Sequence, residues 1–304
     1  MKVFVTGISG QLGHDVMEEL NKRSIQAVGS DLQEGICLDL TQAQQVENVL
    51  SQEKPDVIVH CAAWTAVDAA EDEENQAKVY AVNVGATENL ARMAKKLDAK
   101  MVYLSTDYVF DGQGKEPWKA DCQTYAPLNY YGKTKYLGEE MVRKYLEKYF
   151  IVRIAWVFGV NGNNFIKTML RVGENHDLLT VVDDQIGTPT YTYDLARLLV
   201  DMLESDKYGC YHATNEGGFI SWYEFAREIF DQAAALGNSA YDSDHLTLKP
   251  VTTEEYGVSK ARRPFNSRLD KSKLVENGFE PLPDWRDALS RYLTQLEKSP
   301  TSKR

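Results

Sequence analysis

The sequence Val-Thr-Gly-Ile-Ser-Gly-Gln-Leu-Gly occupies Val5–Gly13, after an apolar β-branched run and at the start of the helical pattern Gln11–Arg23. Gly7 permits a tight turn, Gly10 lets the backbone approach a diphosphate, and Gly13 allows the helix to pack closely on the strand. Free N–H groups at the start of a helix attract phosphates. This junction therefore predicts a dinucleotide site, with an ordinary strand-to-helix turn as the alternative.

Short β-rich runs alternate with helical patterns through the first half of the chain, with long helices expected over Asn75–Leu97 and Tyr131–Tyr149. Asp56–His60 is almost continuously apolar, as in a parallel strand buried on both faces. The repeated β-α-β units predict an α/β fold, a Rossmann-type doubly wound parallel sheet. We expect residues 1–155 to form mainly an NAD(P)-binding domain. Residues 156–304 are expected to form mainly a smaller C-terminal substrate-binding lobe, with some crossover of the chain between the two.

The composition limits the partners. The chain carries 34 Lys and Arg against 45 Asp and Glu, a net charge of −11 that disfavours nucleic acid and anionic lipid. Cys37, Cys61, Cys122 and Cys210 lie far apart and form no Cys-x-x-Cys pair, which is typical of reduced thiols. No secretory signal and no membrane-spanning run is found in the sequence. We expect a cytoplasmic protein without nucleic-acid or membrane partners.

Two aspartates follow the second predicted strand, Ile25–Ser30. Asp31 stands where a carboxylate accepts hydrogen bonds from the adenosine ribose hydroxyls of a dinucleotide. A carboxylate there also repels a 2′-phosphate, so NADH is slightly favoured over NADPH, and a plain turn aspartate is the alternative. Asp39 is expected either to face the adenine or to cap the helix that follows Thr41.

Tyr131 and Lys135 form a Tyr-x-x-x-Lys motif, whose two side chains share one face of a helix. A nearby ammonium favours tyrosinate, so we expect the pKa of the phenol to fall below its free value of roughly 10. Ser105 and Thr106 place hydroxyls at the carboxyl end of the fourth predicted strand. Helical surface packing is the alternative for the motif alone. The motif, the glycine loop and these hydroxyls together predict a catalytic site.

Several segments resemble the extended short-chain dehydrogenases/reductases and, within them, the dTDP-4-dehydrorhamnose reductases. The resemblance covers nearly the whole chain, including the C-terminal half that distinguishes subfamilies. Its segments are Val5–Gly13, His60–Asp68, Ser105–Phe110, Pro127–Lys135, Gly162–Phe165, Asp184–Thr190, Arg263–Pro264 and Asn266–Leu269.

The resemblance implies a role for each matching residue. Thr106 would hydrogen-bond the reacting sugar oxygen, Tyr131 would be the general acid, and Lys135 would tune it and hold the nicotinamide ribose. The implied cofactor-binding residues are Gly7, Ser9, Gly10, Gln11, Leu12, Gly13, Asp31, Asp39, Leu40, Ala62, Ala63, Tyr131 and Lys135. The implied substrate-binding residues are Val67, Thr106, Tyr108, Trp156, Asn163, Asn164 and Arg263.

Four of these substrate-side residues have a second explanation. Trp156 suits a plain core position equally well. Asn163 and Asn164 suit capping of the helix that follows them. Arg263 is a candidate for the diphosphate because a planar guanidinium binds phosphate oxygens bidentately, and a surface arginine is the alternative.

Two departures from related patterns bear on the chemistry. The related sugar-nucleotide dehydratases carry Thr-Asp-Glu, whereas here Thr106 and Asp107 are followed by Tyr108. The second carboxylate is missing, which favours carbonyl reduction over elimination. Some members of the family hold a magnesium ion at a dimer contact formed by glutamates, and here only Asp15 stands at a matching position. No metal ligands are assigned, and both Mg²⁺ dependence and the choice between monomer and homodimer stay open.

The resemblance implies NAD(P)H-dependent reduction of the C4 ketone of dTDP-4-dehydro-6-deoxy-L-mannose (dTDP-4-dehydrorhamnose) to dTDP-L-rhamnose. Two other functions are considered. One is a non-catalytic dinucleotide-binding regulatory subunit, similar to the methionine adenosyltransferase β-subunits, against which the intact Thr106, Tyr131 and Lys135 argue. The other is a nucleotide-sugar epimerase that keeps its NAD tightly bound.

Overall fold

A seven-stranded parallel sheet forms the centre of the molecule in the computed structural model, which describes residues 1–241 and 245–298. Its strands are β1 (Lys2–Thr6), β2 (Gln26–Asp31), β3 (Ile36–Cys37), β4 (Val57–His60), β5 (Lys100–Thr106), β6 (Tyr149–Ile154) and β11 (Gly209–His212). They are hydrogen-bonded in the order β3-β2-β1-β4-β5-β6-β11. The order runs outward from β1 in both directions, which confirms the predicted doubly wound sheet.

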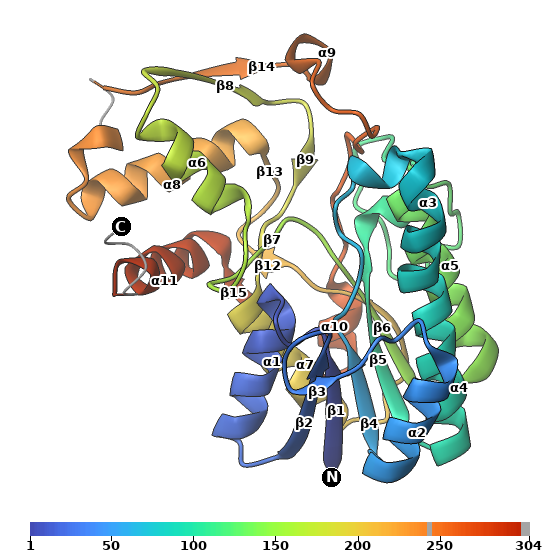
Figure 1. The fold of residues 1–304 in the computed structure, drawn as a ribbon. Helices are drawn as coiled ribbons and strands as arrows, with labels where there is room; N and C mark the ends of the chain where they lie inside the picture. The colour runs from blue at the N-terminus through green and yellow to red at the C-terminus, as the bar shows by residue number, and fades with distance from the viewer. Residues whose placement is uncertain (242–244, 299–304) are drawn as a thin grey trace.

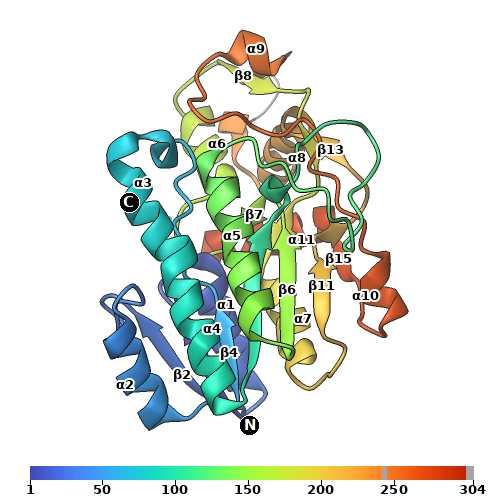
Figure 2. The same ribbon diagram turned by 90° about the vertical axis from the view of Figure 1, so that its right-hand side faces the viewer.

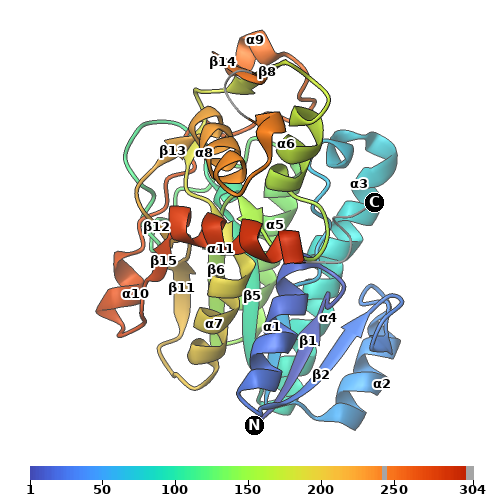
Figure 3. The ribbon, with the colours of Figure 1, turned by 90° about the vertical axis from the view of Figure 1, so that its left-hand side faces the viewer.

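Helices cover both faces of the sheet. On one face lie α1 (Gln11–Lys22) and α7 (Thr192–Leu203), whose apolar side chains pack with Val3 and Val5 of β1 (Figure 3). The other face is covered by α2 (Ala43–Glu53), α4 (Ala86–Leu97) and α5 (Tyr130–Tyr145), as Figure 2 shows. Because both faces are buried, the central strands are apolar almost throughout, as the sequence of β4 predicted.

The two long helices expected from the sequence differ in detail. The predicted helix over 75–97 is α3 (Glu73–Tyr80) and α4, joined by a π-helical turn at Ala81–Gly85. The predicted helix that was to reach Tyr149 ends at Tyr145. Leu146 is extended, and the carbonyl of Lys148 accepts a hydrogen bond from Met101 N at 3.0 Å. Pairing with β5 therefore takes these residues from the helix.

The C-terminal half builds a second, smaller core above the carboxyl ends of the strands (Figure 1). Its helices are α6 (Phe165–Gly173), α8 (Trp222–Ala235), α9 (Thr253–Tyr256) and α11 (Trp285–Lys298), whereas α10 (Ser272–Glu276) packs beside β11, and its Leu274 belongs to the core of the central sheet. Its strands form pairs: β7 (Val157–Phe158) with β10 (Thr190–Tyr191), β8 (Leu178–Val182) with β14 (Thr247–Val251), β9 (Ile186–Gly187) with β13 (Ile220–Ser221), and β12 (Asn215–Glu216) with β15 (Leu282–Asp284).

The chain crosses between the two parts more than once. The strand β11 and the helix α7 follow residue 156 in the sequence but belong to the central sheet and its covering layer. In the other direction, Ala261 N donates to Asp68 Oδ1 at 2.9 Å, which ties the segment after α9 to the loop after β4. Among the helices of the described ranges, none is both long and apolar enough to cross a bilayer.

Candidate active site

The glycine loop joins β1 to α1 and packs against the segment that follows β4. Gly7 has a φ of +73°, and a Cβ atom there would lie 2.6 Å from Ala62 N. A Cβ on Gly13 would lie 2.1 Å from the carbonyl oxygen of Gly7. Gly10 is the N-cap of α1, and no side chain caps that helix. The first-turn N–H groups of α1 thus have no side chain that caps them. The backbone around them leaves no room for a Cβ at Gly7 or Gly13. Both features fit a bound phosphate.

The two aspartates after β2 both line the cavity beside this loop. Asp31 Oδ2 accepts a hydrogen bond from Ser9 N at 3.1 Å, so this carboxylate also braces the loop. Asp39 Oδ1 accepts from the Oγ1 of Thr41 at 2.7 Å, a bond that lowers the pKa of Asp39. The helix that follows is N-capped by Gln42 without a side-chain bond, so Asp39 holds the preceding turn and is not the predicted cap.

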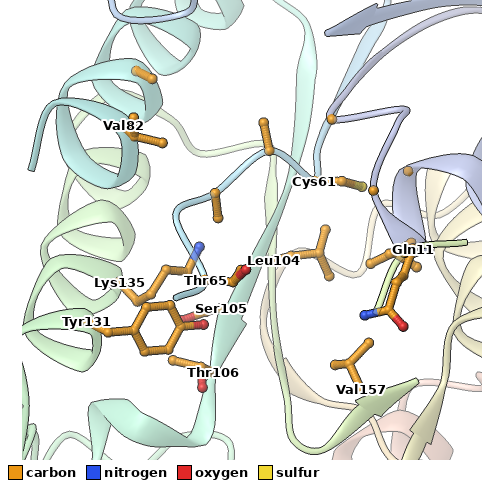
Figure 4. A pocket seen from close by; sticks show the side chains of 18 of the residues that line it. Gln11, Cys61, Thr65, Val82, Leu104, Ser105, Thr106, Tyr131, Lys135 and Val157 are labelled. Carbon is orange, nitrogen blue, oxygen red and sulfur yellow. The ribbon is translucent and has the colours of Figure 1, made fainter. Parts of the chain in front are cut away.

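Thr106, Tyr131 and Lys135 face one cavity of about 1000 Å³, which the glycine loop also lines. Figure 4 shows the Tyr131 ring, the Lys135 amino group and the Thr106 hydroxyl on one side of this cavity, with Gln11 across from them. The start of α5 is fixed by Asn129, whose Oδ1 accepts from Gly132 N at 2.8 Å. The cavity is at the upper end of the size range of small-molecule sites.

The ionisation of the Tyr-x-x-x-Lys pair differs from the expectation. Burial, together with the charge of Asp107, raises the pKa of Tyr131, so the phenol is neutral. The Lys135 ammonium lies 4.2 Å from the ring centroid of Tyr103. Burial lowers the pKa of Lys135 to about 7. The prediction that Lys135 draws the phenol below its free pKa is therefore wrong for this structure, because burial raises the pKa, Asp107 adds to that effect, and Lys135 is not among the groups that act on the phenol.

Asp107 is a site residue that the sequence analysis did not select. It is buried beside the catalytic group, and the Thr106 hydroxyl donates to its Oδ1 at 3.0 Å. Burial raises the pKa of Asp107 to about 6, and a hydrogen bond from Ser267 opposes that shift. Its position directly after Thr106 at a strand end was the available signal. Trp222, at the start of α8, also lines the cavity and was missed because α8 is distant in sequence.

The predicted cofactor-side residues are brought together with one exception. Those that line the cavity are Gly7, Gly10, Gln11, Leu12, Gly13, Asp31, Asp39, Leu40, Ala62 and Ala63. Ser9 is not among the lining residues, and its hydroxyl donates to Glu34 Oε2 at 2.9 Å.

Among the predicted substrate-side residues, Val67, Tyr108, Trp156 and Asn163 line the same cavity. Trp156 has a φ of +51°, which is rare for a bulky residue, and its indole stacks on Trp222 with ring centroids 3.7 Å apart. Backbone strain of this kind is concentrated at functional sites. The position of Trp156 therefore differs from that of a plain core side chain.

Two predicted substrate-side residues lie outside the lining. Asn164 caps α6 by accepting from Lys167 N at 3.1 Å, and it donates to Gln11 Oε1 at 3.0 Å. Arg263 donates to Asp68 Oδ2 at 2.5 Å. It also forms a hydrogen bond with the hydroxyl of Tyr108, a residue that does line the cavity. Asn164 thus has the capping role that was its alternative. Arg263 is a half-buried ion-pair partner at the rim.

Metal ligands do not gather in the described part of the chain, where no three or more His, Cys, Asp or Glu side chains are placed to hold an ion. Asp15 instead accepts a hydrogen bond from Thr192 Oγ1 at 2.5 Å, and burial raises the pKa of its carboxyl group.

The strand order, the glycine loop at the first strand, and the strand-end Thr106 beside Tyr131 and Lys135 define the extended short-chain dehydrogenase/reductase class. A family model described as the RmlD substrate binding domain matches residues 1–298. The dTDP-4-dehydrorhamnose reductase of Aggregatibacter actinomycetemcomitans is 39% identical over 97% of this chain and 99% of its own length. The chain therefore belongs to the dTDP-4-dehydrorhamnose reductase family, which confirms the resemblance.

Solved structures agree with this assignment. A dTDP-4-dehydrorhamnose reductase from Clostridium acetobutylicum is 39% identical and superposes with a TM-score of 0.89, covering 98% of this chain and 100% of that one. One from Bacillus anthracis, solved in complex with NADP, is also 39% identical, with a TM-score of 0.87 over 97% of this chain and 99% of that one. These relatives share the whole architecture, including the C-terminal lobe.

Proposed function

We propose that the protein reduces the C4 ketone of dTDP-4-dehydrorhamnose to dTDP-L-rhamnose with NADH or NADPH. The observation that carries this proposal is that the glycine loop lines the same cavity as Thr106, Tyr131 and Lys135. The family relatives named dTDP-4-dehydrorhamnose reductase, one of them solved with NADP, support the same reaction.

The dinucleotide fits the N-terminal part of the cavity. The side-chain-free cradle at Gly7 and Gly13 and the uncapped start of α1 suit its diphosphate. Asp31, at the end of β2, suits the adenosine ribose, which favours NADH slightly. When bound, the nicotinamide supplies a hydride.

The chain's own residues would supply the proton and the positioning. Tyr131, whose raised pKa keeps it neutral, is a proton donor for the oxygen on which negative charge develops. The Thr106 hydroxyl, which donates to Asp107 in the structure, would turn to donate to the same oxygen, and Lys135 would hold the nicotinamide ribose.

The substrate would lie against the lobe side of the cavity. Val67, Tyr108, Trp156 and Asn163 line the cavity, so we assign them to the sugar and its nucleotide. Arg263 at the rim suits the diphosphate, because its guanidinium is already held beside Tyr108 by Asp68. We assign binding of the dinucleotide cofactor mainly to residues 1–155 and binding of the substrate mainly to residues 156–304.

We also propose a cytoplasmic protein that acts as a monomer or a homodimer. The four cysteines are free thiols in the structure, which supports a reducing compartment.

The decisive test follows nicotinamide absorbance when the protein is mixed with dTDP-4-dehydrorhamnose and either NADH or NADPH. Consumption of the reduced cofactor with formation of dTDP-L-rhamnose is expected. Conversion of the sugar at C4 without net cofactor consumption, by protein that retains NAD, would point to an epimerase. Absence of turnover, together with normal NADH binding and a stoichiometric transferase partner, would point to a regulatory subunit.

A further inference from the structure

A buried ionic cluster lies next to the catalytic pair on α5. Tyr131, Lys135, Glu139 and Arg143 recur at four-residue spacing, so each lies beside the next along the helix. The side chain of Glu139 is 0% exposed, and so is that of its partner Arg153 on β6.

Glu139 receives hydrogen bonds from three elements. Arg153 binds it bidentately, with Nε 2.8 Å from Oε1 and a terminal nitrogen 2.7 Å from Oε2. Arg143 donates to Oε2 at 2.7 Å, and the hydroxyl of Ser105 donates to Oε1 at 2.6 Å. Ser105 immediately precedes Thr106 on β5. The carboxylate therefore joins the helix that carries Tyr131 and Lys135 to the strand that carries Thr106.

Stability alone does not explain such a cluster. A buried ion pair costs desolvation energy, and replacing it with apolar residues is often neutral or stabilising. Burial acts to raise the pKa of Glu139, but its bonds to Arg153 and Arg143 outweigh burial and lower it. A permanently anionic carboxylate is thus maintained one helical turn from Lys135.

The groups that face Lys135 are otherwise neutral near neutral pH. His60 on β4 has its pKa lowered by burial to about 3. The pKa of Cys61 is raised by burial to about 12, and that of Tyr103 on β5 is also raised by burial. Among the described groups that act on Lys135, Glu139 is the anion that opposes the effect of burial on the ammonium.

We propose that Glu139 is a positioning residue of the reaction, which holds α5 against β5 and keeps Lys135 an ammonium, while Arg143 moderates its charge. The inference rests on the proposed function in one respect, namely that Lys135 contacts the nicotinamide ribose. It also assigns a purpose to Arg153, which keeps Glu139 anionic although both side chains are buried.

The test measures the dissociation constant of NADH by fluorescence between roughly pH 6 and pH 9. In the wild type, affinity should fall as pH rises and the ammonium form of Lys135 is lost. Glu139→Gln removes a negative charge, so the midpoint of this loss should move down by roughly one pH unit. Arg143→Gln removes a positive charge and should move it up by a smaller amount. The double variant Glu139→Gln/Arg143→Gln should have a midpoint between those of Glu139→Gln and the wild type.

Asp194→Asn is the matched control. Asp194 is 0% exposed and pairs with Arg291 at 2.8 Å outside the cavity lining, so its loss should lower the Tm without moving the midpoint. The inference fails if Glu139→Gln and Arg143→Gln shift the midpoint in the same direction or leave it unchanged. If Glu139→Gln does not fold, Arg143→Gln alone decides by the sign of its shift. The measurement needs no sugar substrate, so it stands apart from a failure of the proposed reduction.

Discussion

The two sides of the cavity are built by different means. On the nucleotide side, one continuous strand–turn–helix supplies the backbone cradle, at Gly7 and Gly13. On the substrate side, Trp156 and Trp222 stack although many residues separate them, and Arg263 reaches across to Asp68. Local geometry thus builds the turn of the first wall, which Ala62 closes at Gly7, whereas long-range packing builds the second wall. Changes on the two sides should therefore have different kinetic signatures.

The largest effect is expected at Tyr131. Tyr131→Phe removes the proposed proton donor while keeping the ring, so kcat should fall by about 10²–10⁴-fold with little change in stability or NADH affinity. Thr106→Val should cost less, because it removes one hydrogen bond and not the proton. Steady-state reduction of the keto-sugar by folded variants is the measurement.

The neighbouring Tyr130 provides the control for this prediction. Its hydroxyl donates to the carbonyl of Gln76 at 3.3 Å, and it does not line the cavity, so Tyr130→Phe should retain nearly full activity. Full activity in Tyr131→Phe would mean that another group delivers the proton.

On the substrate side, Arg263→Ala should raise the KM for the keto-sugar by roughly tenfold or more and change kcat little. A hydrogen bond to a charged group contributes about 1.5–3 kcal/mol, and loss of binding common to ground and transition states appears in KM. Arg263→Lys should rescue only partly, because lysine lacks the guanidinium fork. Arg262→Ala, at the exposed neighbouring residue, is the control. If the KM of Arg263→Ala is no higher than that of this control, Arg263 serves only its ion pair with Asp68.

On the nucleotide side, Gly13→Ala should weaken NADH binding by roughly tenfold and destabilise the fold by about 1–3 kcal/mol. The added Cβ would lie 2.1 Å from the Gly7 carbonyl oxygen, so the loop must shift. Gly85→Ala is the control, because nothing lies within 4 Å of the Cβ it would add. Fluorescence titration and thermal unfolding would measure both, and equal behaviour of the two variants would refute a tight cradle.

The smallest effect concerns the choice of cofactor. We expect the wild type to have a kcat/KM that is a few-fold higher with NADH than with NADPH, and Asp31→Ala should narrow that ratio. Glu34→Gln is a suitable control, since Glu34 binds the hydroxyl of Ser9 in the same loop but does not line the cavity. A wild type that prefers NADPH would show that Asp31 only braces the loop.

The parallel sheet, the glycine loop and the shared face of Tyr131 and Lys135 followed from the sequence because each depends on local geometry. A strand–turn–helix with three glycines specifies its own backbone, and residues four apart on a helix always lie on one side. The apolar run of β4 likewise identified a strand buried on both faces.

Tertiary structure decided the features that depend on distant contacts. The pKa of Tyr131 is raised, and not lowered, because desolvation is a property of the closed fold. The short strand β11 joins the central sheet through its pairing with β6, a strand distant in the sequence. Asn164 is held by Gln11, and Glu139 by Arg153, through partners that no spacing rule identifies. Local periodicity specifies which face a side chain occupies, whereas its charge state and partners depend on which distant segments bury it.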